Sequence, residues 1–393
     1  MRILHISTVD DAGAGMCCLR IHQSLLEAGV DSKVVVLKNT KHAEGEYQYG
    51  YMTDTIRRAW SKILRMFSLK ITNANKVIAL SREYKTAYTL PISSIDLSKC
   101  EWIEWADIIH LHWVNNFLDY PSFLKRVRKP IIWTLHDEGL FYGIAHHHKN
   151  ILPNHPLEKK YRQVKYKAVR GAENLSFVFL SQMMFNIFGN EKIIEGRRVT
   201  IINNSVNTQV FSPKNRKAMR IKYGIGLQKI VFVLIAVDIS DQNKGLDVLS
   251  KVLLDIRPDV EILAIGENPN HSKWQNVNSV GLVKDQIQMS ELISCANYMA
   301  MPSYQEAFSQ SPMEAMACGL PVVVFPVSGT SELVNEENGV ICDDFTQEAL
   351  KKGIETLMER QYDSIKIRQD MISRFSPNVI AQKYIDLYKN VLM

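Results

Sequence analysis

Short apolar runs alternate with longer amphipathic stretches along the whole 393-residue chain. A short continuous apolar run is typical of a strand buried on both faces, whereas apolar residues spaced three and four apart predict a helix. In the first half, the predicted strands are residues 3–7, 33–37, 108–112, 131–135, 176–180 and 199–202, with helices such as 16–28 and 158–170 between them. In the second half, the predicted strands are residues 230–236, 261–265, 298–301 and 322–325, and the predicted helices are 246–254, 286–294, 312–317 and 346–360. This alternation predicts an α/β fold with two doubly wound parallel sheets.

The boundary between the two domains is predicted within residues 203–215, which are rich in turn-forming residues. We therefore expect an N-terminal Rossmann-like domain over residues 1–207 and a C-terminal one over residues 208–373. A second change of pattern comes at Arg374-Phe-Ser-Pro377, and the apolar spacing after it predicts a final amphipathic helix within 374–393.

The overall composition, with 46% hydrophobic and 22% charged residues, is typical of a soluble globular protein. No run of about 18 apolar residues occurs, so no transmembrane helix is expected, and the first residues have the pattern of a strand rather than of a secretory signal peptide. The six cysteines have neither metal-ligand nor disulfide spacing, which favours a reducing cytoplasm. Nothing in the sequence indicates a nucleic-acid partner.

The net charge of +6 is unevenly distributed along the chain. Between Asp54 and Lys85, eight Lys or Arg residues are offset by two acidic residues, and apolar residues recur at helical spacing within 56–70. Such a helix can lie on an anionic membrane surface, which would place the protein peripherally on the inner face of the membrane. The alternative is an ordinary amphipathic helix that packs on its own domain with a solvated basic face, and the sequence leaves both interpretations open.

The most informative motif is the run from Glu306 to Glu314, in which two carboxylates flank a short polar segment. The pattern predicts a helix start with Ser311 as the N-cap, Pro312 at the first helical position and Glu314 at the third. A helix N-terminus with free N–H groups is a site for a phosphate, and nearby carboxylates can bind sugar and ribose hydroxyls. The run therefore predicts a nucleotide-diphosphate sugar as ligand. Taken singly, Glu314 also fits a capping box and Glu306 a solvated loop position.

Together with the segment Ala317-Cys-Gly-Leu-Pro321 that follows it, this run resembles the paired-glutamate signature of the family 4 retaining glycosyltransferases, the glycosyl transferases group 1 domain. Residues 111–113 and 133–137, Leu-His-Trp and Trp-Thr-Leu-His-Asp, resemble a subset that acts in bacterial surface polysaccharide synthesis. The resemblance implies a GT-B architecture, in which two Rossmann-like domains face a central cleft and the last helix crosses back to the N-terminal domain. It also implies that the C-terminal domain binds the nucleotide sugar and that the N-terminal domain faces the acceptor.

The resemblance further implies which residues of the C-terminal domain hold the donor. They are Lys244, Gly266, Val283, Glu306, Ala307, Phe308, Ser309 and Glu314. Lys244 and the backbone amides after Glu306 would receive the diphosphate, because charge develops there on the leaving nucleotide. Glu314 would bind the ribose, and Glu306 would bind the donor sugar or stabilise positive charge near its anomeric carbon. Gly266 and Val283 match the regions where the base and ribose lie.

In the N-terminal domain, Gly13, Ala14 and Gly15 lie in the predicted turn between the first strand and its helix. The residues alone indicate a tight turn, and the resemblance adds contact with the donor phosphate or the acceptor.

Two histidines, His112 and His136, end buried strands, where open α/β sheets bind their ligands. The resemblance implies that His136 is a catalytic residue near the donor sugar, together with Glu306 and Lys244, and that His112 lies on the acceptor side. Asp137, also on the acceptor side, is expected to orient the imidazole or to fix the loop. The three histidines at 146–148 are expected in an exposed acceptor-side loop rather than at a metal, since adjacent residues cannot all point at one ion.

The resemblance implies a retaining, metal-independent glycosyltransferase of the hexosyltransferase class that uses no cofactor besides its nucleotide-sugar donor. The acceptor would be a glycan or a lipid-linked glycan, and the site of action the cytoplasm. The chain departs from the family at two places. The family often has an arginine in the loop of Lys244, but no arginine lies between residues 221 and 256 here. At the domain junction the family tends to have Pro-Asn-Gly-Val-Asp, whereas residues 203–207 are Asn-Asn-Ser-Val-Asn. Two alternatives therefore stay open, a sugar-nucleotide epimerase of the same fold and a non-catalytic nucleotide-sugar-binding relative.

Overall fold

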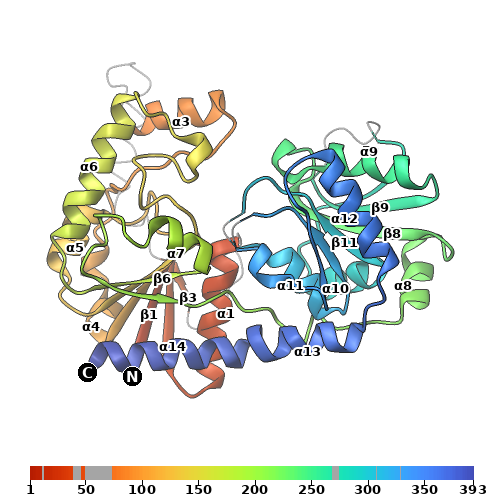
Figure 1. Cartoon of the computed structure of the whole chain (residues 1–393). Helices are drawn as coiled ribbons and strands as arrows, with labels where there is room; N and C mark the ends of the chain where they lie inside the picture. The colour runs from red at the N-terminus through yellow and green to blue at the C-terminus, as the bar shows by residue number, and fades with distance from the viewer. Residues whose placement is uncertain (11–12, 39–45, 49–72, 268–273, 307, 328) are drawn as a thin grey trace. The chain divides into compact units, whose positions relative to one another are not determined.

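This computed structural model describes residues 1–10, 13–38, 46–48, 73–267, 274–306, 308–327 and 329–393. The chain forms two compact units (Figure 1). The first unit contains residues 1–180, 184–202 and 381–393, and the second contains 181–183 and 203–380. The second unit thus begins at residue 203, at the start of the predicted boundary segment 203–215, and residues 203–207 group with it and not with the first unit. The segment predicted as one piece over 374–393 is divided between the units after residue 380.

The first unit is built on a seven-stranded parallel sheet whose strand order is β3-β2-β1-β4-β5-β6-β7. Its strands are β1 (Arg2–Val9), β2 (Asp31–Lys38), β3 (Glu46–Gln48), β4 (Ile108–Leu111), β5 (Ile131–Leu135), β6 (Leu175–Phe179) and β7 (Arg198–Ile201). The strand order reverses between β1 and β4, so the carboxyl ends of these strands form a topological switch point, the usual ligand position in such sheets. The continuous apolar runs of β4, β5 and β6 are buried, as expected for a sheet covered on both faces.

Helices cover this sheet (Figure 1). They are α1 (Gly13–Glu27), α3 (Asn73–Glu83), α4 (Glu101–Trp105), α5 (Tyr120–Arg126), α6 (Pro156–Arg170), α7 (Gln182–Phe188), whose first residues group with the second unit, and the later part of α14 (Pro377–Leu392). Two tyrosines of α14 are buried against the sheet: Tyr388 Oη lies 2.7 Å from His110 Nδ1, and Tyr384 Oη lies 3.1 Å from Thr134 Oγ1. The C-terminal helix thus closes a polar layer on β4 and β5.

The start of α1 corrects the prediction for Gly13, Ala14 and Gly15. These residues form the first turn of the helix instead of a turn before it. A Cβ atom on Gly15 would lie 2.4 Å from the carbonyl oxygen of Val9, so the glycine allows the helix to begin directly against the end of β1.

The second unit contains a six-stranded parallel sheet with the order β10-β9-β8-β11-β12-β13. Its strands are β8 (Ile230–Asp238), β9 (Val260–Glu267), β10 (Val277–Gly281), β11 (Tyr298–Met301), β12 (Val322–Val324) and β13 (Gly339–Ile341). Its helices are α8 (Arg216–Tyr223), α9 (Leu246–Ile256), α10 (Gln286–Ser294), α11 (Gln310–Ala317), α12 (Gln347–Glu359) and α13 (Ser364–Phe375). Apolar residues of the central strands, α9 and α12 share one core.

The elements that the sequence did not predict are short or only partly buried. The edge strand β10 is only partly buried along its length, and β13 has three residues. Helix α8 has one buried residue, Arg220, and is defined by its ends: Asn215 accepts a hydrogen bond from the Ala218 amide, and Gly224 is left-handed. Apolar periodicity is weak in such elements, because few of their side chains enter a core.

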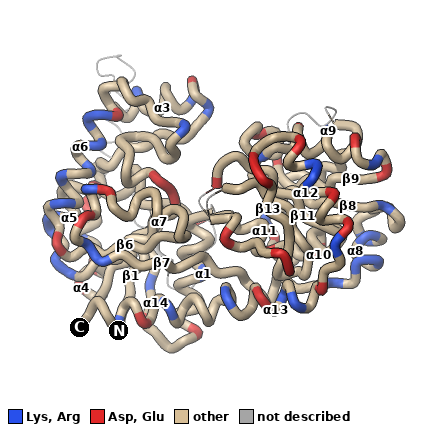
Figure 2. The backbone as a smooth tube through the Cα atoms, viewed as in Figure 1, with Lys and Arg blue, Asp and Glu red and all other residues tan. Residues whose placement is uncertain are grey.

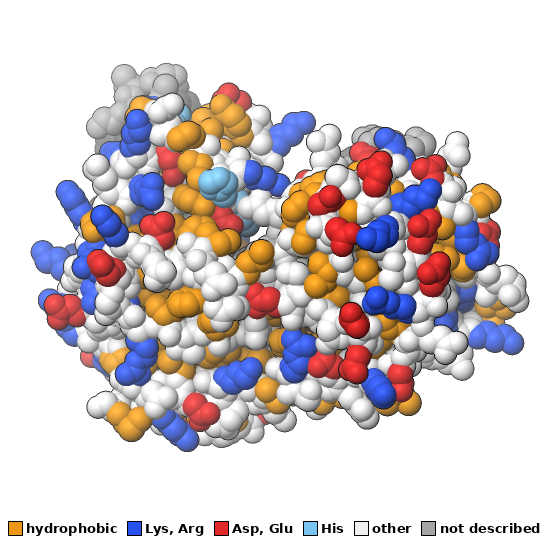
Figure 3. Space-filling view, in the orientation of Figure 1, with side chains coloured by type: hydrophobic (Ala, Val, Ile, Leu, Met, Phe, Trp, Pro, Cys, Tyr) orange, Lys and Arg blue, Asp and Glu red, His pale blue; other side chains and the backbone are white. Residues whose placement is uncertain are grey.

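Acidic and basic residues are interspersed along both units (Figure 2). On the face shown in Figure 3, apolar side chains gather over parts of both units among the charged ones. Within the described residues, no helix combines the length and the apolar character that a membrane crossing requires. The basic helix predicted over 56–70 lies outside the described residues.

Candidate functional site

An ion pair joins two of the predicted site residues in the second unit. Lys244 Nζ lies 2.6 Å from Glu306 Oε1, and the two side chains are 26% and 15% exposed. Lys244 ends a short 3-10 turn (Gln242–Lys244) after β8, whereas Glu306 lies in the loop after β11. These two parallel strands are neighbours, so their carboxyl ends bring the residues to one edge of the sheet.

Backbone hydrogen bonds connect the two loops that carry this pair. The Tyr304 amide donates to the carbonyl of Asn243 at 2.9 Å, and the Asn243 side chain donates to the carbonyl of Gln305 at 3.2 Å. The Asp241 carboxylate accepts from the Asn243 amide at 2.9 Å and fixes the start of the turn. The cation and the carboxylate are therefore held in place by the backbone as well as by each other.

Gly245 gives Lys244 its position. Its φ of +71° is left-handed, and a Cβ atom there would lie 2.3 Å from the carbonyl oxygen of Pro302. Both the backbone conformation and the close approach of the next loop require glycine.

We expect Gly245→Ala to destabilise the protein more than Gly224→Ala does. Gly224 is equally left-handed (φ +67°) but has open space around its Cβ position, so its replacement reports the backbone strain alone, about 1–2 kcal/mol. Gly245→Ala adds the clash with Pro302, a further cost of about 1–3 kcal/mol. Urea unfolding followed by circular dichroism measures both variants. Equal losses of unfolding free energy would show that the loop after β11 does not confine Gly245.

The start of α11 differs from the prediction. The helix begins at Gln310 with Ser309 as N-cap, so Pro312 is its third residue and Glu314 its fifth. Proline is tolerated there because the first four amides of a helix have no intrahelical acceptor. Glu314 lies too far into the helix for the reciprocal bond of a capping box. Its side chain is only 9% exposed, and it is not the solvated surface residue of an ordinary helix end.

The other predicted donor-site residues of the second unit are placed as follows. Phe308 is buried with its ring 6.2 Å from that of Phe375, so its side chain packs in the core and only its backbone is left for a ligand. Gly266 lies in the last part of β9 and Val283 follows β10, at the carboxyl edge of the sheet that also carries Lys244. Ala307 lies outside the described residues.

Three polar atoms near this edge were not anticipated from the sequence. Ser303 Oγ, Gln305 Oε1 and Thr330 Oγ1 are buried and have no hydrogen-bond partner among the described residues. They lie in the loops after β11 and β12. Buried polar atoms are nearly always partnered, so these atoms indicate a place for a ligand or for water. A signal in the sequence existed only for Ser303, which closely follows the buried strand β11.

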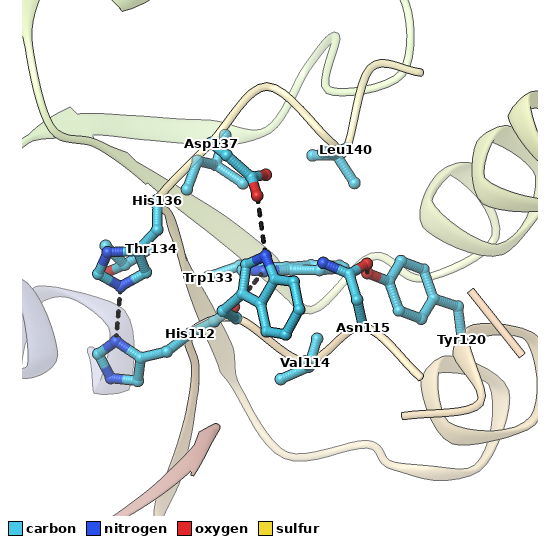
Figure 4. Close-up of a pocket in the computed structure, with 11 residues that line it drawn as sticks. His112, Val114, Asn115, Tyr120, Trp133, Thr134, His136, Asp137 and Leu140 are labelled. Atoms are coloured by element: carbon cyan, nitrogen blue, oxygen red, sulfur yellow. Dashed lines mark hydrogen bonds between the residues drawn. The ribbon is translucent and has the colours of Figure 1, made fainter. Parts of the chain in front are cut away.

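In the first unit, the two predicted histidines contact each other (Figure 4). His112 Nδ1 lies 3.0 Å from His136 Nε2. His112 is 2% exposed, whereas His136 is only partly buried and is the more accessible of the two. Burial lowers the pKa of His136 to about 4, although Asp137 raises it, so the ring is neutral near pH 7.

Asp137 fixes the loop, and its hydrogen bonds run to other partners than His136. Its carboxylate accepts from Trp113 Nε1 at 2.8 Å, from the Gly139 amide at 2.8 Å and from His146 Nδ1 at 2.6 Å. Burial raises the pKa of Asp137, but His146, the Gly139 amide and His147 together lower it, so the pKa is lowered overall. Of the two roles predicted for Asp137, the geometry favours support of the loop.

The stretch from Gly139 to His146 is buried, which corrects the expectation of an exposed loop. Of the three consecutive histidines, His146 is buried, His147 is partly buried and His148 is exposed. The carboxylate of Glu158 accepts hydrogen bonds from three consecutive amides, those of Gly143, Ile144 and Ala145. Lys165 Nζ donates to the carbonyl of Gly139 at 2.5 Å. The loop has an internal set of polar partners, which keeps it in place over β5.

A small cavity of ≈ 20 Å³ lies beside His136 (Figure 4). Its lining includes the polar residues Asn115, Tyr120, Thr134 and Asp137. This volume and this lining suit a single water molecule. The cavity is too small for a sugar, so a larger ligand would contact His136 from outside it.

Three buried histidines, His5, His110 and His112, have ring nitrogens within 4.8 Å of one another, a spacing compatible with a metal ion. However, five of the six nitrogens already have hydrogen-bond partners, which include Tyr388, Thr134 and His136. Histidine metal ligands use a free nitrogen. The described arrangement is therefore that of a hydrogen-bond network.

Part of the chain is similar to known glycosyltransferases. Residues 229–360 match the family model described as glycosyl transferases group 1. A curated relative, an N,N'-diacetylbacillosaminyl-diphospho-undecaprenol alpha-1,3-N-acetylgalactosaminyltransferase of Campylobacter jejuni, is 23% identical over 228 residues, which are 55% of this chain and 60% of the relative. The chain thus spans somewhat more than half the length of that relative.

Two solved structures resemble the whole chain. Sucrose-phosphate synthase from Thermosynechococcus elongatus superposes with a TM-score of 0.66 at 16% identity and covers 100% of this chain and 99% of its own. The Anabaena protein Alr3699/HepE in complex with UDP-glucose has a TM-score of 0.65 at 16% identity, with 99% and 100% covered. At this identity the likeness shows the fold, and it confirms the predicted GT-B architecture of two Rossmann-like domains.

Proposed function

We propose that this chain, in which residues 229–360 match the glycosyl transferases group 1 family, is a retaining glycosyltransferase that moves a hexose from a nucleotide-diphosphate sugar to a glycan or lipid-linked glycan. The observation that carries the proposal is the pair of Lys244 and Glu306 at the carboxyl edge of the second sheet. A cation beside a carboxylate suits a ligand that has a diphosphate at one end and sugar hydroxyls at the other.

Each predicted donor residue has a distinct part in this proposal. Lys244 binds the diphosphate and neutralises the charge that develops on it as the bond to the sugar breaks. The N-terminus of α11 adds N–H donors and the positive end of the helix dipole. Glu314 binds ribose hydroxyls. Glu306 binds the donor sugar or stabilises positive charge at its anomeric carbon.

The proposed reaction needs no protein nucleophile. The acceptor hydroxyl attacks the anomeric carbon on the face that the nucleotide leaves, the bond from that carbon to the phosphate oxygen breaks, and the departing phosphate takes the proton of the hydroxyl. The configuration at the anomeric carbon is retained. We propose that the reaction runs without a metal, because Lys244 and the helix N-terminus supply the positive charge that the leaving group requires.

The acceptor and the location are further parts of the proposal. The Campylobacter jejuni relative is named for a sugar linked to diphospho-undecaprenol, which supports a lipid-linked glycan as acceptor. We propose a role in bacterial surface polysaccharide synthesis at the cytoplasmic face of the membrane, with residues 56–70 as the candidate contact.

Calorimetric titration with UDP, GDP and ADP tests the donor site. We expect one of the three to bind, and Glu314→Ala to weaken that binding by about 1–3 kcal/mol because a buried polar partner is lost. Glu336→Ala, which changes an exposed glutamate of the same unit, is the control and should bind as the wild type does. Failure of all three nucleotides to bind would overturn the proposal.

Analysis of the products separates the proposed reaction from its alternatives. Incubation with the nucleotide sugar and an acceptor should give acceptor-dependent transfer. An isomerised sugar without acceptor would identify an epimerase, and binding without turnover would identify a non-catalytic relative.

A further inference from the structure

Three histidines of the first unit form a hydrogen-bonded chain that runs from the buried sheet to the partly accessible His136. His136 Nε2 lies 3.0 Å from His112 Nδ1, and His112 Nε2 lies 3.0 Å from His5 Nδ1. His5 stands in β1, and the other two follow β4 and β5. Parallel pairing of these strands places the three rings on one face of the sheet.

A chain of this kind fixes where the protons are. A neutral imidazole carries one N–H and one lone pair, so the middle ring, His112, must donate to one neighbour and accept from the other. Two arrangements satisfy this condition. In the first, His5 Nδ1–H donates to His112, His112 Nδ1–H donates to His136 Nε2, and the proton of His136 is on Nδ1. In the second, His136 Nε2–H donates to His112 Nδ1 and His112 Nε2–H donates to His5 Nδ1. His136 Nδ1 then has no proton and can only accept a hydrogen bond.

The environment of His5, at the buried end of the three histidines, distinguishes the two arrangements. His5 Nε2 is fully buried and has no hydrogen-bond partner among the described residues. The neighbouring His110 cannot supply one, because its two nitrogens are bonded to Tyr388 and Thr134 at 2.7 Å each. The first arrangement leaves a lone pair at His5 Nε2, and the second leaves an N–H. Buried N–H groups without an acceptor are the rarer and costlier case.

The same burial keeps the hydrogen-bonded histidines neutral. Burial, with smaller contributions from the neighbouring histidines, lowers the pKa of His5 and of His112 well below the usual value. A charged His112 that donates in both directions is thereby disfavoured, and only the two neutral arrangements compete.

We propose that His112 and His5 are positioning residues that hold His136 as the neutral Nδ1–H tautomer, so that His136 offers a hydrogen-bond donor to an oxygen of the donor sugar. This inference rests on the proposed function for the identity of the ligand. It has a chemical consequence: Nδ1 of His136 already carries a proton, so the ring serves as a donor to the sugar and not as a general base.

Nitrogen-15 NMR of the full-length protein with labelled histidine tests the tautomer without any substrate. The His136 signals, assigned by their loss in His136→Asn, should show the pattern of a protonated Nδ1 and a bare Nε2. A protonated Nε2 at His136 would overturn the proposal, and so would an equal mixture of the two tautomers in the wild type.

A matched pair of variants tests the role of His112, which faces His136 Nε2 directly. Asparagine places an N–H close to the position of Nδ1, so His112→Asn should keep the His136 tautomer, whereas His112→Leu removes the donor and should give a mixture. His148→Leu, which removes an exposed histidine, should leave the His136 signals unchanged. An unchanged tautomer in His112→Leu would contradict the role of His112. If His112→Leu does not fold, the wild-type spectrum and His112→Asn still decide.

Kinetics connect the tautomer to the ligand. In His112→Leu, kcat/KM for sugar transfer should fall about fivefold to tenfold, the loss of about one hydrogen bond, while the affinity for the free nucleotide stays unchanged. An unchanged kcat/KM despite a mixed tautomer would overturn the contact with the sugar. If His136 of the wild type is the Nδ1–H tautomer but the protein transfers no sugar, the proposed function fails, whereas the proposal that the neighbouring histidines fix the tautomer still holds.

Discussion

Replacing Lys244 by methionine is expected to lower the rate of sugar transfer by about a hundredfold to a thousandfold, the range for removing one group that stabilises developing negative charge. The variant keeps most of the volume of the side chain and removes the cation. It also leaves the Glu306 carboxylate, 15% exposed, without its partner at 2.6 Å. Nucleotide-diphosphate affinity should fall as well, by about 1.5–3 kcal/mol for a hydrogen bond to a charged group. Steady-state transfer kinetics and calorimetry measure the two effects.

The partner variant, Glu306→Gln, should separate binding from reaction. The ion pair holds Lys244 in the described structure, so a diphosphate must compete with Glu306 or share the lysine with it. Glutamine keeps the shape and removes the negative charge, and we expect the free nucleotide to bind more tightly while transfer slows. Weaker nucleotide binding in Glu306→Gln would contradict this account of the pair.

An exposed lysine of the same unit supplies the control for both variants. Lys251→Met on α9 removes the same charge at a solvated position and should change neither nucleotide affinity nor transfer. If Lys251→Met matched Lys244→Met, the effect would come from the net charge of the unit and not from the site.

The protein is expected to lose stability steeply as the pH falls from 7 to 5, because it buries neutral histidines. Burial lowers the pKa of His110, which is 0% exposed, to about 3, against about 6.5 in an unfolded chain. Below pH 6.5 the unfolded state therefore binds a proton that the folded state does not, and acid favours unfolding. At pH 5 this difference amounts to about 2 kcal/mol for His110, at roughly 1.4 kcal/mol for each pH unit below 6.5.

Other buried groups whose pKa values are shifted differ in whether they contribute to this loss of stability between pH 7 and 5. The pKa values of His5 and His112 are lowered in the same direction by burial, so they add to the loss. The pKa of Asp137 is lowered as well, but for a carboxylate this stabilises the folded state above the unfolded pKa of about 3.9 and is lost only below it. Asp137 therefore does not contribute between pH 7 and 5.

Urea unfolding at pH 7 and pH 5 checks this prediction. The difference between the two pH values should be about 2 kcal/mol smaller in His110→Gln than in the wild type, whatever the cost of the substitution itself. The exposed His148→Gln should keep the full wild-type difference. The same pH dependence in all three proteins would show that the buried histidines do not set it.

The sequence by itself determined the class of the fold. Apolar runs such as those of β5 and β8 predicted buried parallel strands, because a strand covered on both faces must be apolar throughout. Helix α12 was predicted almost to its ends, since a helix that packs one face on a core repeats its apolar residues every three or four positions. The resemblance carried by Glu306, Glu314 and the residues around them indicated the family.

Only the tertiary structure decided which residues meet. Lys244 and Glu306 are 62 positions apart in sequence, and His5 lies 107 positions from His112, so no local pattern links either pair. Strand order in the sheets brings them together. The partners of Asp137 were decided in the same way, because one of them, His146, follows a loop segment whose amides donate to the distant Glu158. Local patterns report whether a residue faces a core, whereas partners across a sheet depend on how distant strands pair.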